Sequence, residues 1–181
     1  MIRLIAEIGI NHFGDKEKAL RLIKIASSSG CWGVKFQYRQ SDFFSENDEM
    51  GSTLIRDELE TSNLSDSILP ELVACSKENG LAIGFSFFRE LDLIHFYNNI
   101  SFKIDFIKIP SPEFRNYNLI TQAKEKSNCV MISYGAGEEE EIKNAIKKSE
   151  LRKSDVVFHC ISNYPVANGN QQLSFLKRLK K

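Results

Sequence analysis

The fold of this protein is decided by residues 3–38, RLIAEIGINHFGDKEKALRLIKIASSSGCWGVKFQY. The two ends of this stretch, 3–10 and 33–38, are apolar runs of the length that buried strands have. The middle, 16–28, has helical spacing, because one face collects Ala19, Leu22, Ile23 and Ala26. Asp15 is a suitable N-cap for that helix. The stretch therefore predicts one strand–helix–strand unit.

The same alternation continues along the rest of the chain. Further strands are predicted at 81–87, 106–110, 129–134 and 156–162. Further helices are predicted at 67–79, 90–98, 117–126, 138–148 and 171–180. Alternation of this kind is typical of repeated βα units with a parallel sheet. The polar stretch 39–66 is too long for an ordinary βα loop, and we expect an excursion over the functional face.

Six βα units leave two fold classes open. A closed (β/α)8 TIM-type barrel needs eight units, so one interpretation is an incomplete barrel of about six units. The other is an open, doubly wound sheet of six strands. No shift in composition divides the chain, and we expect a single domain over 1–181.

Composition excludes several classes of function. The 24 basic residues balance the 24 acidic ones, which argues against a nucleic-acid partner. No apolar run approaches the ~20 residues of a membrane span, and the amino end lacks the layout of a signal peptide. Four scattered cysteines favour reduced thiols in a cytoplasmic protein. They are Cys31, Cys75, Cys129 and Cys160.

Polar side chains recur where the predicted strands end. They are Glu7, Lys35, Lys108, Ser111, Ser133, Asn163 and Tyr164. In parallel β/α proteins the carboxyl ends of the strands bind ligands, so these residues predict one shared site. Buried lysines need counter-ions, and Glu7 is a carboxylate at a matching height. Two lysines with nearby hydroxyls predict a receptor for phosphate or carboxylate.

Other polar features are weaker. Gly135 and Gly137 precede a helix start where an anion could approach backbone N–H groups, although taken alone they favour an ordinary βα turn. We expect His12 to form hydrogen bonds in a turn, His95 to lie on the surface and His159 to be a satisfied core residue. No histidine pair has the spacing of metal ligands.

At these residues the sequence resembles the N-acetylneuraminate (sialic acid) synthase family. The resemblance is carried, in order, by AEIGINHFG, VKFQ, KIPSPE, ISYGAGEEEEI and HCISNYP. It implies a (β/α)8 barrel followed by a small antifreeze-like domain. It also implies condensation of phosphoenolpyruvate with an N-acylated aldose such as N-acetylmannosamine, which gives a nine-carbon 2-keto sugar acid and phosphate.

The resemblance assigns roles to individual residues. The phosphoenolpyruvate contacts match Lys35, Lys108, Ser111, Ser133 and Asn163. Gln37 and Tyr164 match sugar contacts. Glu113 lies near the reacting carbons, and Glu7 matches the carboxylate that handles the attacking water or a proton.

The resemblance also implies parts that this chain does not supply. A divalent metal, Mn or Mg, polarises the aldehyde in the family, but its two histidines belong to units beyond residue 181. The antifreeze-like domain, which closes the partner's site in a homodimer, is likewise expected to be absent. A completing polypeptide is one way to restore these parts.

Four positions depart from the family pattern, namely Phe13, Phe87, Tyr134 and Ala136. Two other functions stay open beside the synthase. One is an inactive truncated remnant or an anion-binding module without catalysis. The other is a different phosphoenolpyruvate-dependent aldol enzyme, although the NHxG and HCxSxYP segments favour the sialic type. The motifs do not distinguish sialic, legionaminic and pseudaminic substrates.

Overall fold

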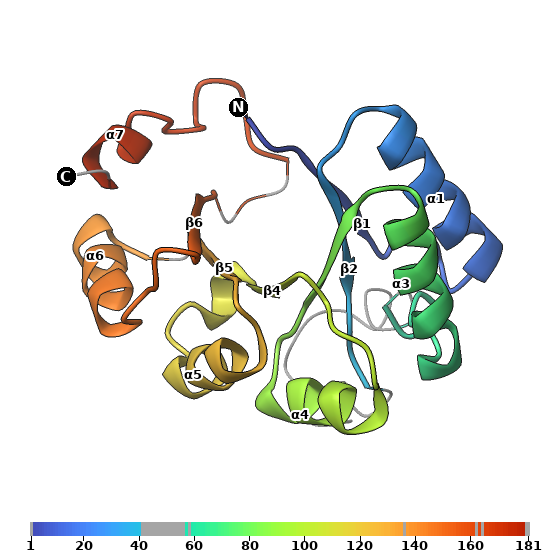
Figure 1. The fold of residues 1–181 in the computed structure, drawn as a ribbon. Helices are drawn as coiled ribbons and strands as arrows, with labels where there is room; N and C mark the ends of the chain where they lie inside the picture. Colours follow the sequence, from blue (N-terminus) through green and yellow to red (C-terminus); the bar gives the residue numbers. More distant parts are fainter. Residues whose placement is uncertain are drawn as a thin grey trace. The chain divides into compact units, whose positions relative to one another are not determined.

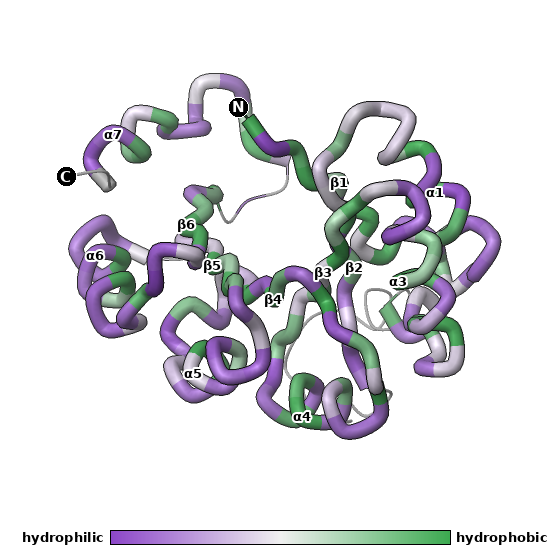
Figure 2. Tube along the Cα trace, viewed as in Figure 1, coloured by the Kyte–Doolittle hydropathy of each residue, from purple (hydrophilic) through white to green (hydrophobic). Residues whose placement is uncertain are grey.

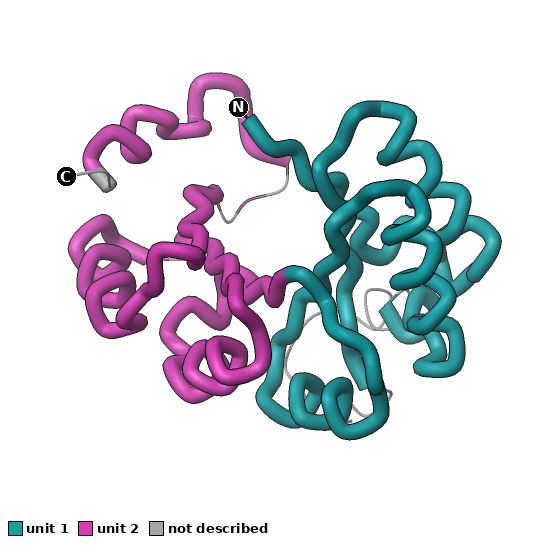
Figure 3. Tube along the Cα trace, in the orientation of Figure 1, with its two compact units in different colours: residues 1–105 teal, residues 106–181 magenta. Residues whose placement is uncertain are grey.

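The computed structural model describes residues 2–40, 57, 59–135, 137–161, 163 and 165–179. The chain divides into two compact units, Met1–Asp105 and Phe106–Lys181 (Figure 3). Each unit repeats the predicted alternation of strand and helix (Figure 1). The strands of each unit pair in parallel, in the order of the sequence.

The first unit is built on three strands, β1 (Ile5–Gly9), β2 (Gly33–Gln37) and β3 (Ala82–Ser86). Its helices are α1 (Lys16–Ser28), α3 (Leu69–Glu78) and α4 (Glu90–Asn99), with a short 3-10 helix, η2 (Asp66–Ile68), before α3. The core of this unit is fully buried at Val34, Phe36, Ile83, Phe85, Ile23, Leu72 and Phe96.

The second unit has the strands β4 (Phe106–Ile109), β5 (Val130–Tyr134) and β6 (Val156–His159). Its helices are α5 (Tyr117–Lys126), α6 (Glu139–Lys148) and α7 (Phe175–Leu179), and η3 (Ser111–Glu113) follows β4. Asp155, just before β6, accepts hydrogen bonds from the Val130 backbone N–H at 2.9 Å and from Arg152. This carboxylate therefore ties the start of β5 to the turn before β6.

Helix α1 illustrates why the sequence pattern was sufficient for local structure. The Asp15 side chain accepts a hydrogen bond from the Lys18 backbone N–H at 3.0 Å, as an N-cap does. Gly30 follows the helix with φ of +75°, a conformation that suits glycine. The buried residues of α1 are Ala19, Ile23 and Ala26. Figure 2 shows that α1 contains both hydrophilic and hydrophobic positions.

All six predicted strands are present, and each is shorter than predicted at one or both ends. The helix predicted over 171–180 is wrong in extent, because α7 covers only Phe175–Leu179. Gln172 has φ of +46°, which is incompatible with a right-handed helix at that point. Most of the predicted 39–66 excursion, at 41–56 and 58, lies outside the described residues. Within the described ranges, no helix is long and apolar enough to cross a membrane.

Candidate functional site

A lysine–carboxylate–hydroxyl cluster lies on the three strands of the first unit. Lys35 Nζ is 2.8 Å from Glu7 Oε1 and donates to Ser86 Oγ at 2.5 Å. Glu7 and Lys35 are register partners on β1 and β2. Lys35 is only 7% exposed, whereas the Glu7 side chain is 55% exposed. The lysine is therefore the buried member of the pair, and Glu7 is its half-exposed counter-ion.

Burial controls the chemistry of Lys35. Loss of hydration lowers the pKa of its ammonium group, and the nearby Glu7 carboxylate partly opposes that effect. An ammonium group carries three donors, and among the described residues Glu7 and Ser86 use two of them. A third donor is thus available for an anionic ligand beside a half-exposed carboxylate.

Gln37 follows Lys35 on the same face of β2, and its amide oxygen accepts a hydrogen bond from Arg39 Nη1 at 2.6 Å. Gly9, at φ of +57°, makes room beside it. A Cβ at Gly9 would lie 3.0 Å from Glu7 Oε1 and 3.8 Å from Gln37 Nε2. The end of β1 therefore leaves space in which the Glu7 and Gln37 side chains approach each other.

The second unit contains a similar lysine–hydroxyl pair. Lys108 on β4 donates to Ser133 Oγ on the neighbouring strand β5 at 2.6 Å and to the Ile109 carbonyl at 2.8 Å. Both side chains are half-buried. Each unit thus holds one lysine against a serine hydroxyl near the carboxyl ends of its strands.

Three other predicted site residues lie close to β4 or β6. Ser111 and Glu113 are half-buried in η3, directly after β4, and Asn116 Nδ2 donates to Glu113 Oε2 at 3.0 Å. Asn163 is exposed after β6, and its backbone N–H donates to the Ile161 carbonyl at 2.8 Å. Tyr164 lies outside the described residues.

The structure therefore groups the predicted residues by unit. Glu7, Lys35 and Gln37 lie together in the first unit, and Lys108 lies with Ser133 in the second. That both groups serve one site stays a prediction. Sequence reasoning missed Ser86, although a serine at the end of the apolar strand 81–87 follows the same pattern as Ser133.

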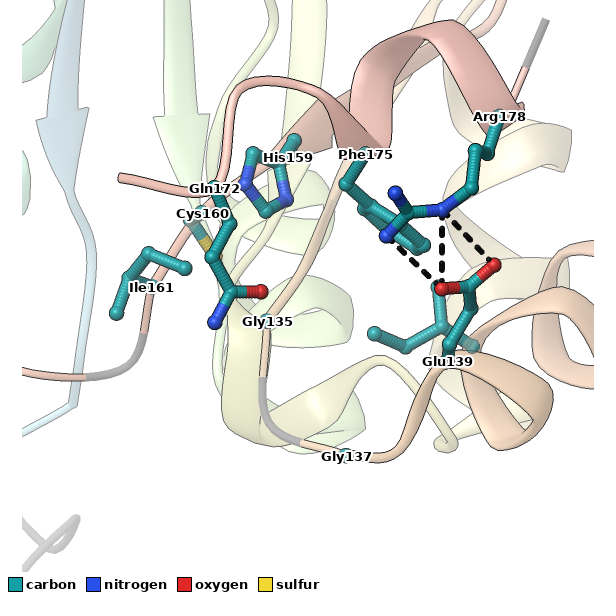
Figure 4. Close-up of a pocket in the computed structure, with 10 residues that line it drawn as sticks. Gly135, Gly137, Glu139, His159, Cys160, Ile161, Gln172, Phe175 and Arg178 are labelled. Carbon is teal, nitrogen blue, oxygen red and sulfur yellow. Dashed lines mark hydrogen bonds and ion pairs between the residues drawn. The ribbon is translucent and has the colours of Figure 1, made fainter. Parts of the chain in front are cut away.

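In the second unit, Gly135 and Gly137 between β5 and α6 line a small pocket of about 80 Å³ (Figure 4). Here the structure favours the ordinary-turn interpretation of Gly135 and Gly137. Glu138 and Glu141 form a capping box at the start of α6, and Glu139 pairs with Arg178 at 3.0 Å. Because carboxylates already occupy this helix start, it is a poor place for an anion.

The histidines differ from expectation in one of three cases. His12 is buried and hydrogen-bonds the Gly9 carbonyl and the Gly14 N–H, as predicted, and burial lowers the pKa of its imidazole. The His95 side chain is 36% exposed, which agrees with a place at the surface, and its Nδ1 lies 2.8 Å from the Tyr38 hydroxyl. His159 is not a satisfied core residue, because its buried Nδ1 has no hydrogen-bond partner among the described residues.

The divalent metal implied by the resemblance does not fit the side chains that the structure describes. Across 2–40, 57, 59–135, 137–161, 163 and 165–179, no three His, Cys, Asp or Glu residues come together as a metal site would require. All four cysteines are free thiols; Cys75 is buried and the other three are half-buried.

Comparison with known proteins places these residues in a sequence family. A model of the NeuB family matches residues 22–181. An uncharacterized protein of Methanocaldococcus jannaschii is 30% identical over 183 residues, which cover 98% of this chain and 51% of that protein. The N,N'-diacetyllegionaminic acid synthase of Campylobacter jejuni is 28% identical, with 98% of this chain and 56% of that protein covered. The chain spans about half the length of these curated relatives.

A solved structure supports the fold class. The crystal structure of N-acetylneuraminic acid (sialic acid) synthetase from Leptospira borgpetersenii, in complex with citrate, has a TM-score of 0.82 and 26% identity. The match covers 99% of this chain and 61% of that one. The six βα units therefore have the predicted TIM-barrel type of α/β fold, and the doubly wound alternative is wrong.

Proposed function

Because the chain belongs to the NeuB family, we propose that it supplies the phosphoenolpyruvate-binding part of a nonulosonate synthase. The observation that carries the proposal is the recurrence of one arrangement, a lysine held against a serine hydroxyl on the next strand. It occurs at Lys35 with Ser86 and at Lys108 with Ser133. Phosphoenolpyruvate presents a phosphate and a carboxylate, and ammonium and hydroxyl donors bind both groups.

The proposed reaction joins phosphoenolpyruvate to the open-chain form of an N-acylated aldose such as N-acetylmannosamine. The enol carbon attacks the aldehyde carbon, and the aldehyde oxygen takes up a proton. Water then adds to the resulting oxocarbenium-like carbon and loses a proton. Loss of inorganic phosphate from that carbon leaves a nine-carbon 2-keto sugar acid.

The individual roles in this proposal are the ones that the resemblance implies, and the side-chain charges are compatible with them. Lys35, Lys108, Ser111, Ser133 and Asn163 hold phosphoenolpyruvate. Their ammonium, hydroxyl and amide groups supply the donors that its phosphate and carboxylate need.

The remaining site residues serve the sugar and the attacking water. Glu7 lies 2.8 Å from Lys35, and its side chain is half-exposed. Water can therefore reach the Glu7 carboxylate, which can accept the proton. Glu113, oriented by Asn116, lies near the reacting carbons. Gln37 and Tyr164 contact the sugar.

The wider setting is part of the same proposal. The protein acts in the cytoplasm as a homodimer, together with the metal-binding and antifreeze-like parts that the resemblance implies. Free thiols at all four cysteines support a reducing compartment. The sugar is a sialic, legionaminic or pseudaminic acid precursor.

Calorimetric titration with phosphoenolpyruvate tests the anion site. Lys108→Ala is expected to weaken binding by about ten- to a hundredfold, because a charge-assisted hydrogen bond is lost. The exposed Lys147 on α6 provides the control, and Lys147→Ala should bind like the original protein. Full affinity for phosphoenolpyruvate in Lys108→Ala would show that Lys108 does not belong to the binding site.

Release of inorganic phosphate tests catalysis. The assay contains phosphoenolpyruvate, N-acetylmannosamine and Mn²⁺, with this chain alone or with a polypeptide that supplies the remaining barrel units. Phosphate release in either preparation supports the synthase. Binding of phosphoenolpyruvate with no release in both would instead favour an anion-binding module.

A further inference from the structure

Arg39 contacts the proposed sugar-binding residue Gln37 directly. The two residues are two positions apart, so they share one face of the chain as it leaves β2. Arg39 Nη1 donates to Gln37 Oε1 at 2.6 Å, a short hydrogen bond of the kind that a charged donor makes. The resemblance assigned Arg39 no role.

The guanidinium of Arg39 is held from the side of β3 and α4. It packs over the Phe88 ring, with 4.0 Å from Cζ to the ring centroid. The next residue, Gln40, donates its backbone N–H to Asp92 Oδ1 at 3.1 Å. Asp92 is fully buried in the first turn of α4 and pairs with Arg89 at 2.7 Å. The backbone next to Arg39 is therefore fixed by a buried ion pair.

This arrangement decides which end of the Gln37 amide is available. A guanidinium has only donors, so the Gln37 atom that faces Arg39 has to be the oxygen. The amide nitrogen of Gln37 then points toward Gly9. A Cβ atom placed on Gly9 would lie 3.8 Å from this nitrogen. Burial lowers the pKa of Arg39 to about 10, so the group remains charged at neutral pH.

We propose that Arg39 is a positioning residue that makes Gln37 a hydrogen-bond donor, so that Gln37 selects a sugar with an acceptor oxygen over one with an ammonium group. The proposal rests on the assignment of Gln37 as a sugar contact. An acyl carbonyl accepts from the Gln37 N–H groups, whereas an ammonium group would present donors to donors. The nearby Glu7 carboxylate does not offset this mismatch, because its charge is already compensated by Lys35.

The orientation of the amide is tested without any ligand. The side-chain amide resonances of Gln37, assigned by their loss in Gln37→Glu, are compared in the original protein, in Arg39→Met and in Arg21→Met. Arg21 is an exposed arginine on α1 and is the matched control. The resonances are expected to move in Arg39→Met only. Unchanged resonances in Arg39→Met would overturn the proposal.

Selectivity is tested by titrating N-acetylmannosamine and mannosamine, at a pH where the amine is protonated and with phosphoenolpyruvate present. Arg39→Met is expected to reduce the preference for the N-acetyl sugar by about tenfold, as loss of one charge-assisted hydrogen bond implies. Arg39→Met should still bind phosphoenolpyruvate, because Lys35 and Lys108 are retained. In a Gln37→Ala background, Arg39→Met should have little further effect, because Arg39 acts through Gln37.

The outcomes separate this proposal from the proposed function. If phosphoenolpyruvate binds and the sugar preference is unchanged in Arg39→Met, the role of Arg39 is wrong and the synthase assignment stands. If the two substitutions are additive, Arg39 does not act through Gln37. If neither sugar binds while phosphoenolpyruvate does, the proposal that Gln37 selects between the two sugars is wrong. If phosphoenolpyruvate does not bind the original protein, the proposed function itself fails.

Discussion

At the scale of single residues, Lys35 stands out as a buried lysine among the described residues. It is 7% exposed and meets a carboxylate on one neighbouring strand and a hydroxyl on the other. Burial of a lysine costs free energy, and a half-exposed Glu7 recovers only part of that cost. The retention of such a cation is explained more readily by ligand binding than by stability.

Replacement of Lys35 separates these two roles. Lys35→Met is expected to keep or raise the free energy of unfolding at neutral pH, by up to about 4 kcal/mol, because an apolar side chain fills the site without desolvation of a charge. Phosphoenolpyruvate binding should be lost. Urea denaturation measures the first effect and calorimetry the second, with the exposed Lys147→Met as control.

The difference in unfolding free energy between the original protein and Lys35→Met is expected to depend on pH. Burial lowers the pKa of Lys35 in the folded protein below its ordinary value of 10.5. At a pH between the folded-state pKa and 10.5, the unfolded chain therefore binds more protons than the folded one. The contribution of Lys35 to stability therefore rises with pH across that window. The stability gap between the original protein and Lys35→Met should narrow from neutral pH to about pH 10. A constant gap would contradict the desolvation argument.

At the scale of elements, the turn between β1 and α1 combines two unusual conformations. Phe13 has φ of +52° and Gly14 has φ of +73°. A left-handed conformation costs a residue with a side chain ~1–2 kcal/mol, and asparagine tolerates it better than most. The Phe13 ring is 55% exposed and lies 4.0 Å from Lys18 Nζ. The turn geometry at this position therefore suits asparagine better than phenylalanine.

A pair of substitutions isolates the backbone contribution at Phe13. Phe13→Asn and Phe13→Ala both remove the contact with Lys18, so they differ mainly in tolerance of a positive φ. Phe13→Asn is expected to be more stable than Phe13→Ala by about 0.5–1 kcal/mol. Urea denaturation of the two variants measures the difference. Equal stability of the two would show that the turn relaxes away from the left-handed conformation.

At the scale of the whole molecule, β6 differs from the other strands. Val156 and Phe158 are 37% and 36% exposed, whereas Val130 and Ile132 on the paired strand β5 are fully buried. An apolar strand with an exposed face is prone to association with other chains. The curated relatives that the chain matches are about twice as long.

A charged substitution on β6 tests whether its exposed face promotes self-association of the 181-residue chain. Val156→Lys is expected to reduce self-association in concentration-dependent light scattering. It should change the free energy of unfolding by less than about 0.5 kcal/mol, because the side chain is already exposed. Val130→Lys is the contrasting variant and should prevent folding, since it buries an unpaired charge. Undiminished association in Val156→Lys would exclude β6 as the contact surface.

Much of the architecture could be predicted from the sequence because it depends on local periodicity. The spacing of Ala19, Ile23 and Ala26 and the cap at Asp15 define α1 with correct bounds. The extent of α7 could not be predicted in this way, because the positive φ of Gln172 leaves no trace in apolar spacing. The exposure of Glu7 could not be predicted either, since a pattern along one strand does not say what covers each face.

The sequence by itself therefore determined the strand–helix order and the residue types near the strand ends, whereas its pattern of units left a partial barrel and a doubly wound sheet open. Only the tertiary structure decided which of these groups meet. Lys35 bonds Ser86 across 51 positions of sequence and Lys108 bonds Ser133 across 25. Helical and strand patterns act over a few residues, whereas burial, register and the pairing of charges depend on elements that are distant in the chain.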